Sequence, residues 1–259
     1  MSAVVGEGGW LAVVGTGPGD SAWMTPETSA VIAAATDLVG YERYVERVAD
    51  SGQRRHVSDN REETARAAHA LDLAASGARV AVISGGDPGI FAMAAAVWET
   101  LERADHERWA AVEIRVTPAV SAIQAVAARA GAPLGNDFCV ISLSDNLKPW
   151  AVIERRVRLA AEADFALAFY NPISRARPWQ LGAAIEAVAA HRAPATPVVL
   201  GTAVGRADEA LTITDLARFD PAAADMRTLV IVGASTTRVI AAADGRPRVY
   251  TPRLYPADY

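Results

Sequence analysis

The sequence has few of the residues that build disulfide or metal frameworks. Its 259 residues include one cysteine, Cys139, so no intrachain disulfide forms and we expect a reducing compartment, the cytoplasm. Cys139 lies in the apolar run Phe138–Ile141, which favours a buried strand residue over a reactive thiol. The four histidines are not spaced as metal ligands, so we predict no metal site.

Long apolar runs and an excess of basic residues are absent as well. No apolar stretch reaches the roughly 18 residues that cross a bilayer, and the N-terminus has no signal-peptide pattern. We therefore expect neither a membrane nor export. The net charge of −5 argues against a surface that coats nucleic acid. Lys148 is the only lysine, so nearly all cationic groups are guanidinium groups, which pair well with carboxylates.

Short apolar runs alternate with alanine-rich stretches along most of the chain, which predicts an α/β fold. Strands are expected at 10–14, 37–40, 55–57, 79–83 and 112–116, then at 138–143, 164–170, 197–203, 209–214, 228–233 and near 246–248. Helices are expected at 26–35, 61–77, 90–103, 117–131, 149–163 and 178–191. The segment Ala132–Asp137 breaks the periodicity, which predicts two domains, 1–132 and 133–259. The second half is richer in strands and favours a mixed sheet.

Two loops rich in glycine and proline follow apolar strands. The first is Gly15–Asp20 (GTGPGD) and the second is Ser84–Gly89 (SGGDPG). Small residues at the end of a strand let the backbone approach a ligand closely. Acidic residues beside the loops disfavour a phosphate and suit amine, hydroxyl or cationic groups. Together the loops predict one small molecule cradled by main chain.

The first loop does not have the dinucleotide-binding pattern. Asp20 stands where GxGxxG requires a third small residue, and an aspartate there would obstruct close packing of helix on strand. The GK[ST] ending of a P-loop is missing too. A turn without a ligand is the alternative for either loop alone, but the occurrence of both loops favours binding.

With Pro118–Ala122, these loops resemble the tetrapyrrole methylases, S-adenosylmethionine-dependent enzymes of corrin and siroheme synthesis, over roughly residues 10–250. Further stretches resemble the branch of that family that methylates carbon 17 of precorrin-3B. These stretches are Val39–Tyr44, Gly86–Ala94, Leu134–Asp145, Pro149–Arg156 and Phe169–Arg175. One departure is Ala119, which replaces the glycine usual in the family's PGxS motif.

The resemblance implies two α/β domains, with a mainly parallel N-terminal sheet, a mixed C-terminal sheet and the cofactor cleft between them. S-adenosylmethionine would be the cofactor and S-adenosylhomocysteine its product. The expected cofactor contacts are Pro18, Gly85, Gly86, Asp87, Ile90, Ser121, Ala122, Tyr170, Asn171, Thr202, Ala203, Gly233 and Ala234. Asp87 has the alternative role of shaping its own loop.

Substrate binding and catalysis are implied for a smaller set of residues. Precorrins carry many carboxylates, so Arg43, Lys148, Arg175 and Arg177 are candidates to bind them. Asp20 is a candidate catalytic base. The reaction implied is methylation of precorrin-3B at carbon 17 with ring contraction to precorrin-4, carried out by a homodimer.

Three alternatives stay open. One is a sister activity, on cobalt-factor III or another precorrin or uroporphyrinogen. A nucleotide-dependent oxidoreductase is the second, although the position of Asp20 counts against it. The third, a non-catalytic tetrapyrrole-binding protein, would bind pigment but not the methyl donor.

Overall fold

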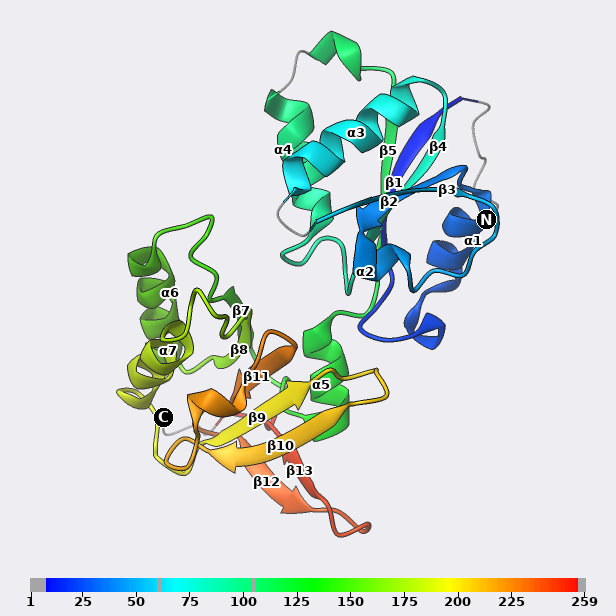
Figure 1. Ribbon diagram of the computed structural model, residues 1–259. Helices are drawn as coiled ribbons and strands as arrows, with labels where there is room; N and C mark the ends of the chain where they lie inside the picture. The colour runs from blue at the N-terminus through cyan, green and yellow to red at the C-terminus, as the bar shows by residue number, and fades with distance from the viewer. Residues whose placement is uncertain (1–7, 60–61, 104–105, 256–259) are drawn as a thin grey trace. The chain divides into compact units, whose positions relative to one another are not determined.

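The computed structural model describes residues 8–59, 62–103 and 106–255 (Figure 1). The chain forms two compact units, one up to Ser121 and one from Ala122 on. The division after residue 132 differs from this one by helix α5 (Ala122–Ala130) and the short strand β6 (Gly131–Ala132). The compact units place α5 with the second half because it packs on strands of that half.

The first unit is built on a parallel sheet of five strands in the order β3-β2-β4-β1-β5 (Figure 1). The strands are β1 (Trp10–Gly15), β2 (Asp37–Tyr41), β3 (Arg54–Ser58), β4 (Arg79–Ser84) and β5 (Glu113–Thr117). The predicted parallel N-terminal sheet is thus confirmed. The strands β1 and β4 lie inside the sheet and are buried almost throughout, as continuous apolar runs in parallel sheets are.

Helices cover both faces of this sheet. They are α1 (Pro26–Ala34), α2 (Glu42–Val45), α3 (Glu63–Ala75) and α4 (Met93–Arg103), with short 3-10 turns at Ser21–Trp23 and His106–Arg108. Along β1, Leu11 and Val13 pack with α3 and α4, whereas Trp10, Ala12 and Val14 pack with α1 and α2. Because successive side chains of a strand point to opposite faces, β1 contributes to two separate hydrophobic cores, one on each face of the sheet.

Local residues mark the ends of two helices in the first unit. Thr25 caps α1, because its hydroxyl accepts a hydrogen bond from the Thr28 amide at 3.1 Å, and Pro26 occupies the first helical position. Gly77, two residues beyond α3, adopts a left-handed backbone with φ +92°. The start expected for α3, at residue 61, lies outside the described residues.

The second unit contains a mixed sheet in the order β10-β9-β11-β8-β7, which confirms the predicted mixed C-terminal sheet. Its strands are β7 (Phe138–Ser142), β8 (Ala166–Tyr170), β9 (Pro197–Thr202), β10 (Ala210–Asp215) and β11 (Thr228–Val232). Only β7 and β8 are parallel neighbours in it. Helices α6 (Trp150–Glu162) and α7 (Gln180–Ala189) pack on one face around Phe169 and Leu181.

A small third sheet completes this unit, in the order β12-β13-β6. It joins β12 (Arg238–Ala241) and β13 (Pro247–Tyr250) to β6. The sequence predicts β13 but not β12, because every residue of β12 is exposed and its apolar pair has no alternation to reveal a strand. A further 3-10 turn covers Pro221–Ala223.

A buried carboxylate fastens the later part of the second unit. Asp164, with φ +60°, accepts hydrogen bonds from the Ser235 amide at 2.9 Å and the Ser235 hydroxyl at 2.6 Å. Its other contacts are an ion pair with Arg192 at 3.1 Å and the hydroxyl of Tyr255. Asp164 lies just before β8, and it therefore connects that part of the chain to Tyr255, the last residue that the structure describes.

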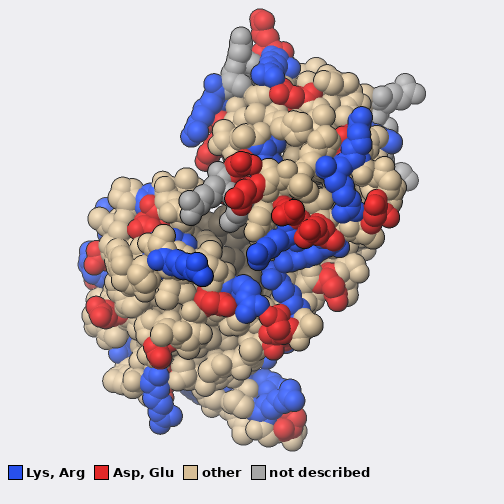
Figure 2. All heavy atoms as spheres, in the orientation of Figure 1, with Lys and Arg blue, Asp and Glu red and all other residues tan. Residues whose placement is uncertain are grey.

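Two surface properties bear on function. On the face shown in Figure 2, basic and acidic side chains are interspersed over both units. Among the described residues, no helix combines the length and the apolar character that a membrane span requires.

Candidate functional site

The two glycine-proline loops of the first unit are bonded to each other through main chain. The Gly86 amide donates to the Gly17 carbonyl at 2.9 Å, and the Gly17 amide donates back to Gly86 at 3.3 Å. Thr16 adds a hydrogen bond from its hydroxyl to the Ser84 carbonyl at 3.1 Å. The loops lie together because β1 and β4 are parallel neighbours and end at the same edge of the sheet.

Gly15 is the point where three loops meet. A Cβ there would come within 2.5 Å of both the Ala119 Cβ and the Gly86 carbonyl oxygen, and within 2.7 Å of Pro88 Cδ. Gly86 is different: its φ is +67°, and a Cβ there would meet nothing within 4 Å. The first glycine permits packing between loops, whereas the second supplies a left-handed turn with open space on its Cβ side.

Asp87 shapes its loop. One carboxylate oxygen accepts from the Gly89 amide at 2.8 Å, and the other accepts from the Ala119 amide at 2.9 Å. Ala119 makes this bond through its backbone amide, which does not depend on the side chain at that position. Asp87 thereby joins the GGDP loop to the Pro118–Ser121 segment, in which Ser121 is buried.

Asp20 ends the first loop in an exposed position. Its carboxylate accepts a hydrogen bond from the Ala22 amide at 2.9 Å and so caps the turn Ser21–Trp23. Pro18 is half-buried and Ile90 is half-buried after the second loop. The structure thus places Pro18, Gly85, Gly86, Asp87 and Ile90 around one edge of the first sheet, with Asp20 at the surface.

The second unit brings a corresponding set of loops to the ends of β7 and β8. The Tyr170 hydroxyl accepts from the Ile123 amide at 3.0 Å, which satisfies one unpaired donor in the first turn of α5 beside Ala122. Asn171 donates from its side-chain amide to the Ser142 hydroxyl at 3.0 Å. The Asn171 carbonyl accepts from the buried Arg177 guanidinium at 3.0 Å.

The remaining expected cofactor contacts follow β9 and β11. Thr202 shares a hydrogen bond with the Thr228 hydroxyl at 2.9 Å. A Cβ on Gly233 would come within 2.6 Å of the Thr237 Cβ, so close packing requires glycine there. The neighbouring residues Ala203 and Ala234 are both buried. Small, buried residues therefore line these strand ends, as main-chain recognition of a ligand requires.

Left-handed backbone conformations gather at the same loops. Among the described residues, Phe91, Asn171 and Ala203 have φ of 53°, 51° and 50°, and they follow β4, β8 and β9. Such conformations are unfavourable for residues with a side chain and concentrate at ligand sites. The fourth, Asp164, belongs to the buried network described above. Asparagine adopts this conformation more readily than other residues with a side chain, so the sequence gives no signal only for Phe91 and Ala203.

The four candidate substrate residues differ in environment. Arg43 and Arg175 are exposed. Lys148 is half-buried, and burial together with the neighbouring Arg156 charge lowers its pKa. Arg177 is only 7% exposed, and it supports Asn171. Arg177 therefore stabilises the loop that follows β8.

Two polar residues near these loops were missed as functional candidates. Gln180, only 1% exposed, donates to the Asp145 carboxylate at 3.0 Å. Its side-chain oxygen has no hydrogen-bond partner within the described part of the chain. Asp145 ends the stretch Leu134–Asp145, which carries part of the family resemblance, but nothing in the sequence marks Gln180.

In each unit, these loops offer main-chain groups and polar side chains beside small residues that admit a ligand. Across the described ranges, no three side chains of His, Cys, Asp or Glu gather in a way that could hold a metal ion.

Comparisons with known proteins agree with this arrangement. A family model for Tetrapyrrole (Corrin/Porphyrin) Methylases matches residues 11–220. A Precorrin-3B C(17)-methyltransferase from Sinorhizobium sp is 55% identical over 249 residues, covering 95% of this chain and 97% of the relative. A Probable cobalt-factor III C(17)-methyltransferase from Salmonella typhimurium is 42% identical, covering 93% of this chain and 99% of the relative.

A solved structure is similar as well. The crystal structure of the methyltransferase CobJ has a TM-score of 0.89 and 48% identity, covering 94% of this chain and 100% of that one. Both the sequence and the architecture therefore match, and this chain belongs to the tetrapyrrole (corrin/porphyrin) methylases.

Proposed function

We propose that this protein transfers a methyl group from S-adenosylmethionine to carbon 17 of precorrin-3B, with ring contraction to precorrin-4. The observation that carries the proposal is the 55% identity, over 95% of the chain, to a precorrin-3B C(17)-methyltransferase. The loops that hold the strained Asn171 and the bonded Gly17–Gly86 pair lie within the matched residues. This is a step in the making of cobalamin.

S-adenosylmethionine, when bound, supplies an electrophilic methyl group. We assign its recognition to the expected residues of both units. In the first unit these are Pro18, Gly85, Gly86, Asp87, Ile90 and Ser121; in the second they are Ala122, Tyr170, Asn171, Thr202, Ala203, Gly233 and Ala234. The open space above Gly86 and the small residues at the strand ends fit a ligand read by main chain. Holding reactants in line accounts for much of such catalysis, about 7–11 kcal/mol.

The substrate-binding residues divide into two roles. Arg43, Lys148 and Arg175 stay proposed partners of substrate carboxylates, since two of them are exposed and the third is half-buried. Arg177 is proposed to act indirectly, by holding the Asn171 carbonyl. Asp20 is proposed as the proton acceptor, because its carboxylate is exposed at the end of the first loop.

A second candidate function is the same methylation on cobalt-factor III, which carries a metal in the ring. The 42% identity to a probable cobalt-factor III enzyme over 93% of the chain favours its inclusion. The higher identity to the precorrin-3B enzyme favours the metal-free substrate.

A direct assay distinguishes the two. Purified protein is incubated anaerobically with 13C-methyl-labelled S-adenosylmethionine and either precorrin-3B or cobalt-factor III, and the labelled methyl is mapped by NMR. We expect a label on carbon 17 and faster turnover of precorrin-3B. Faster turnover of the cobalt compound would select the second function, and binding of pigment without methyl transfer would contradict both.

Assembly, location and domain boundary are also proposals. We expect a homodimer in the cytoplasm, the former from family resemblance and the latter from the lone cysteine. Sedimentation velocity tests the dimer, and cell fractionation tests the location. Expression of residues 133–259 alone tests whether the boundary after residue 132 delimits a unit that folds by itself.

A further inference from the structure

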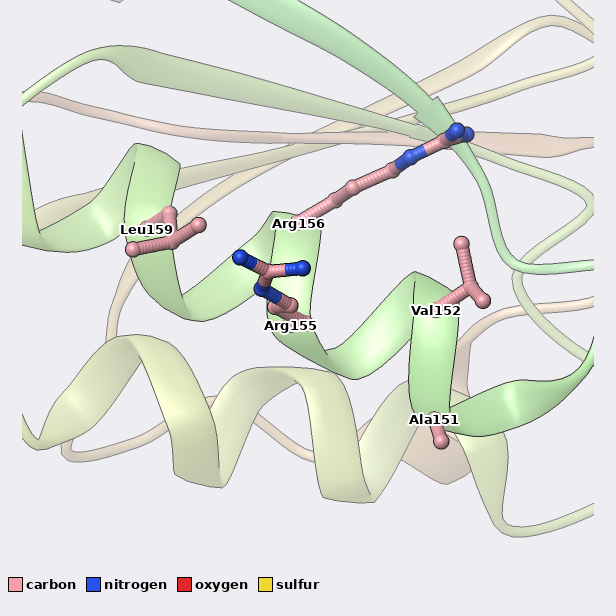
Figure 3. A pocket seen from close by; sticks show the side chains of 5 residues that line it. All are labelled: Ala151, Val152, Arg155, Arg156 and Leu159. Atoms are coloured by element: carbon pink, nitrogen blue, oxygen red, sulfur yellow. The ribbon is translucent and has the colours of Figure 1, made fainter.

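One face of α6 lines a pocket of about 380 Å³ that no expected site residue occupies (Figure 3). Its lining residues are Ala151, Val152, Arg155, Arg156 and Leu159. They recur at helical spacing on the side of α6 that the core residues Ile153 and Val157 leave free. Figure 3 shows the Arg156 side chain fully extended and Arg155 curled beside the helix. The pocket therefore combines an apolar floor with two guanidinium groups.

The charges of this pocket are not neutralised by the protein. Within the described part of the chain, neither Arg155 nor Arg156 has a carboxylate within ion-pair distance. Arg158, two positions beyond Arg156, does pair with Glu162 at 3.8 Å. Arg156 lies close enough to Lys148 for their like charges to interact unfavourably. An anionic ligand would relieve that repulsion and satisfy the guanidinium donors.

The pocket begins at the edge of the sheet where the proposed ligand loops lie. Helix α6 follows the loop that leaves β7, and Ala151 and Val152 are in its first turn. In the parallel pair β7–β8, Ser142 is the register partner of Tyr170. The carboxyl end of β8, which carries Asn171, is therefore adjacent to the strand that leads into α6. Ligands of open α/β sheets bind beyond the carboxyl ends of their strands.

We propose that Arg155 and Arg156 bind carboxylate side chains of the tetrapyrrole substrate, with Val152 and Leu159 contacting its apolar portions. This inference rests on the proposed function, and it adds a carboxylate-binding subsite to it. All five lining residues are exposed on one helix, so the surface is open and would contact one edge of the ring with its acidic arms. Val152 and Leu159 would contact the apolar atoms of that edge, and the two guanidinium groups would bind its carboxylates.

The test uses the double variant Arg155→Ala/Arg156→Ala, with Arg158→Ala as the matched control on the same helix. Binding of uroporphyrin, a stable macrocycle with a carboxylate on every side chain, is measured by fluorescence quenching. The KM for precorrin-3B is measured in parallel, and S-adenosylhomocysteine affinity is measured by calorimetry. We expect the double variant to bind uroporphyrin at least about tenfold more weakly and to have a KM for precorrin-3B at least about tenfold higher, with unchanged S-adenosylhomocysteine affinity. Arg158→Ala should match the parent.

Two results would overturn the subsite. One is a double variant that equals the parent in uroporphyrin affinity and KM. The other is a double variant whose sedimentation coefficient changes while pigment binding does not, because this face would then be an interface between copies of the chain. Failure of the proposed function looks different: the parent would bind uroporphyrin in an arginine-dependent way and yet transfer no methyl group.

Discussion

The carboxylate of Asp87 accepts a hydrogen bond from the backbone amide of Ala119 at 2.9 Å, although 32 positions separate the two residues in sequence. A second bond, from the Gly89 amide, holds the other oxygen. Asp87 is therefore a clasp between two loops that are both expected at the cofactor. Its negative charge strengthens both bonds, since charge-assisted hydrogen bonds are about twice as strong as neutral ones.

The first prediction concerns that clasp. Asp87→Ala removes both acceptors and leaves two amides without their partner, so we expect a loss of about 1–3 kcal/mol in the free energy of unfolding. Because the loops separate, affinity for S-adenosylhomocysteine should fall about tenfold or more, as measured by calorimetry. The exposed Glu186→Ala variant on α7 is the control. Unchanged affinity in Asp87→Ala would show that the loops keep their shape without the clasp.

A pair of glycine substitutions gives opposite expectations. Gly15→Ala places a Cβ within 2.5 Å of two neighbouring atoms, so it should destabilise the protein by about 1–3 kcal/mol and weaken cofactor binding. Gly182, inside α7, has space for a Cβ, whose nearest neighbour would be Pro221 Cγ at 4.0 Å. Gly182→Ala should therefore stabilise by about 0.5–1 kcal/mol. Urea unfolding measures both, and a stabilised Gly15→Ala variant would contradict the packing described for the loops.

Substitution of Arg177 should change cofactor affinity, whereas substitution of Arg175 should change the KM for the tetrapyrrole. Arg177→Ala removes the hydrogen bond to the Asn171 carbonyl and leaves a hole in a buried position. We expect it to weaken S-adenosylhomocysteine binding. Arg175→Ala removes an exposed charge, so it should raise the KM for the tetrapyrrole several-fold and leave cofactor affinity as it is. Steady-state kinetics and calorimetry separate the two, and identical profiles would refute the division of roles.

Asp20→Asn tests the proposed proton acceptor. The amide oxygen of asparagine still caps the turn at Ser21, so the fold should stay intact, whereas the proton-accepting carboxylate is lost. We expect kcat to fall by about 10²-fold or more with little change in cofactor affinity. If turnover and donor affinity both equal those of the parent, Asp20 is not the base.

The acid stability of the first unit should depend on Asp37. Burial would raise the pKa of this fully buried carboxylate, but hydrogen bonds from Arg54, Thr36 and His56 outweigh burial and lower it from 3.8 to about 2. A carboxyl whose pKa is lower in the folded state stabilises the fold above its unfolded pKa, and that stabilisation is lost as the pH falls through the folded value. The shift corresponds to about 2 kcal/mol.

The measurement compares urea unfolding of the parent and of Asp37→Asn between about pH 5 and pH 2. The variant should be less stable at the upper end, and the difference should shrink by about 2 kcal/mol toward the lower end. Parallel loss of stability in both proteins over that range would mean that Asp37 contributes nothing to the pH dependence.

The order of elements is predictable from the sequence because local signals and burial agree along most of the chain. Strand β1 is apolar throughout, and Thr25 and Pro26 mark the start of α1. The strand β12 is missed because it is short and exposed and depends on its pairing with β13. The local pattern of apolar residues therefore predicts strands and helices that have a buried face. It misses an exposed strand such as β12, which forms only by pairing with another strand.

The candidate site is predictable only in part. The glycine-proline loops can be found by their composition, and they do lie together. The burial of Arg177 is not predictable, because arginine is normally exposed and only the folded chain supplies the Asn171 carbonyl that accepts its hydrogen bond. The same holds for Gln180, whose partner Asp145 lies 35 positions away. Pairings at such distance depend on topology.

The network around Asp164 has a practical consequence for engineering. The Tyr255 hydroxyl bonds to the Asp164 carboxylate, which Arg192 and Ser235 also bind. Tyr255 is therefore held in a fixed position on the second unit. A reporter fused beyond it would depart from a defined spot on the second unit. The length of the tether would then set how far the reporter reaches from Tyr255.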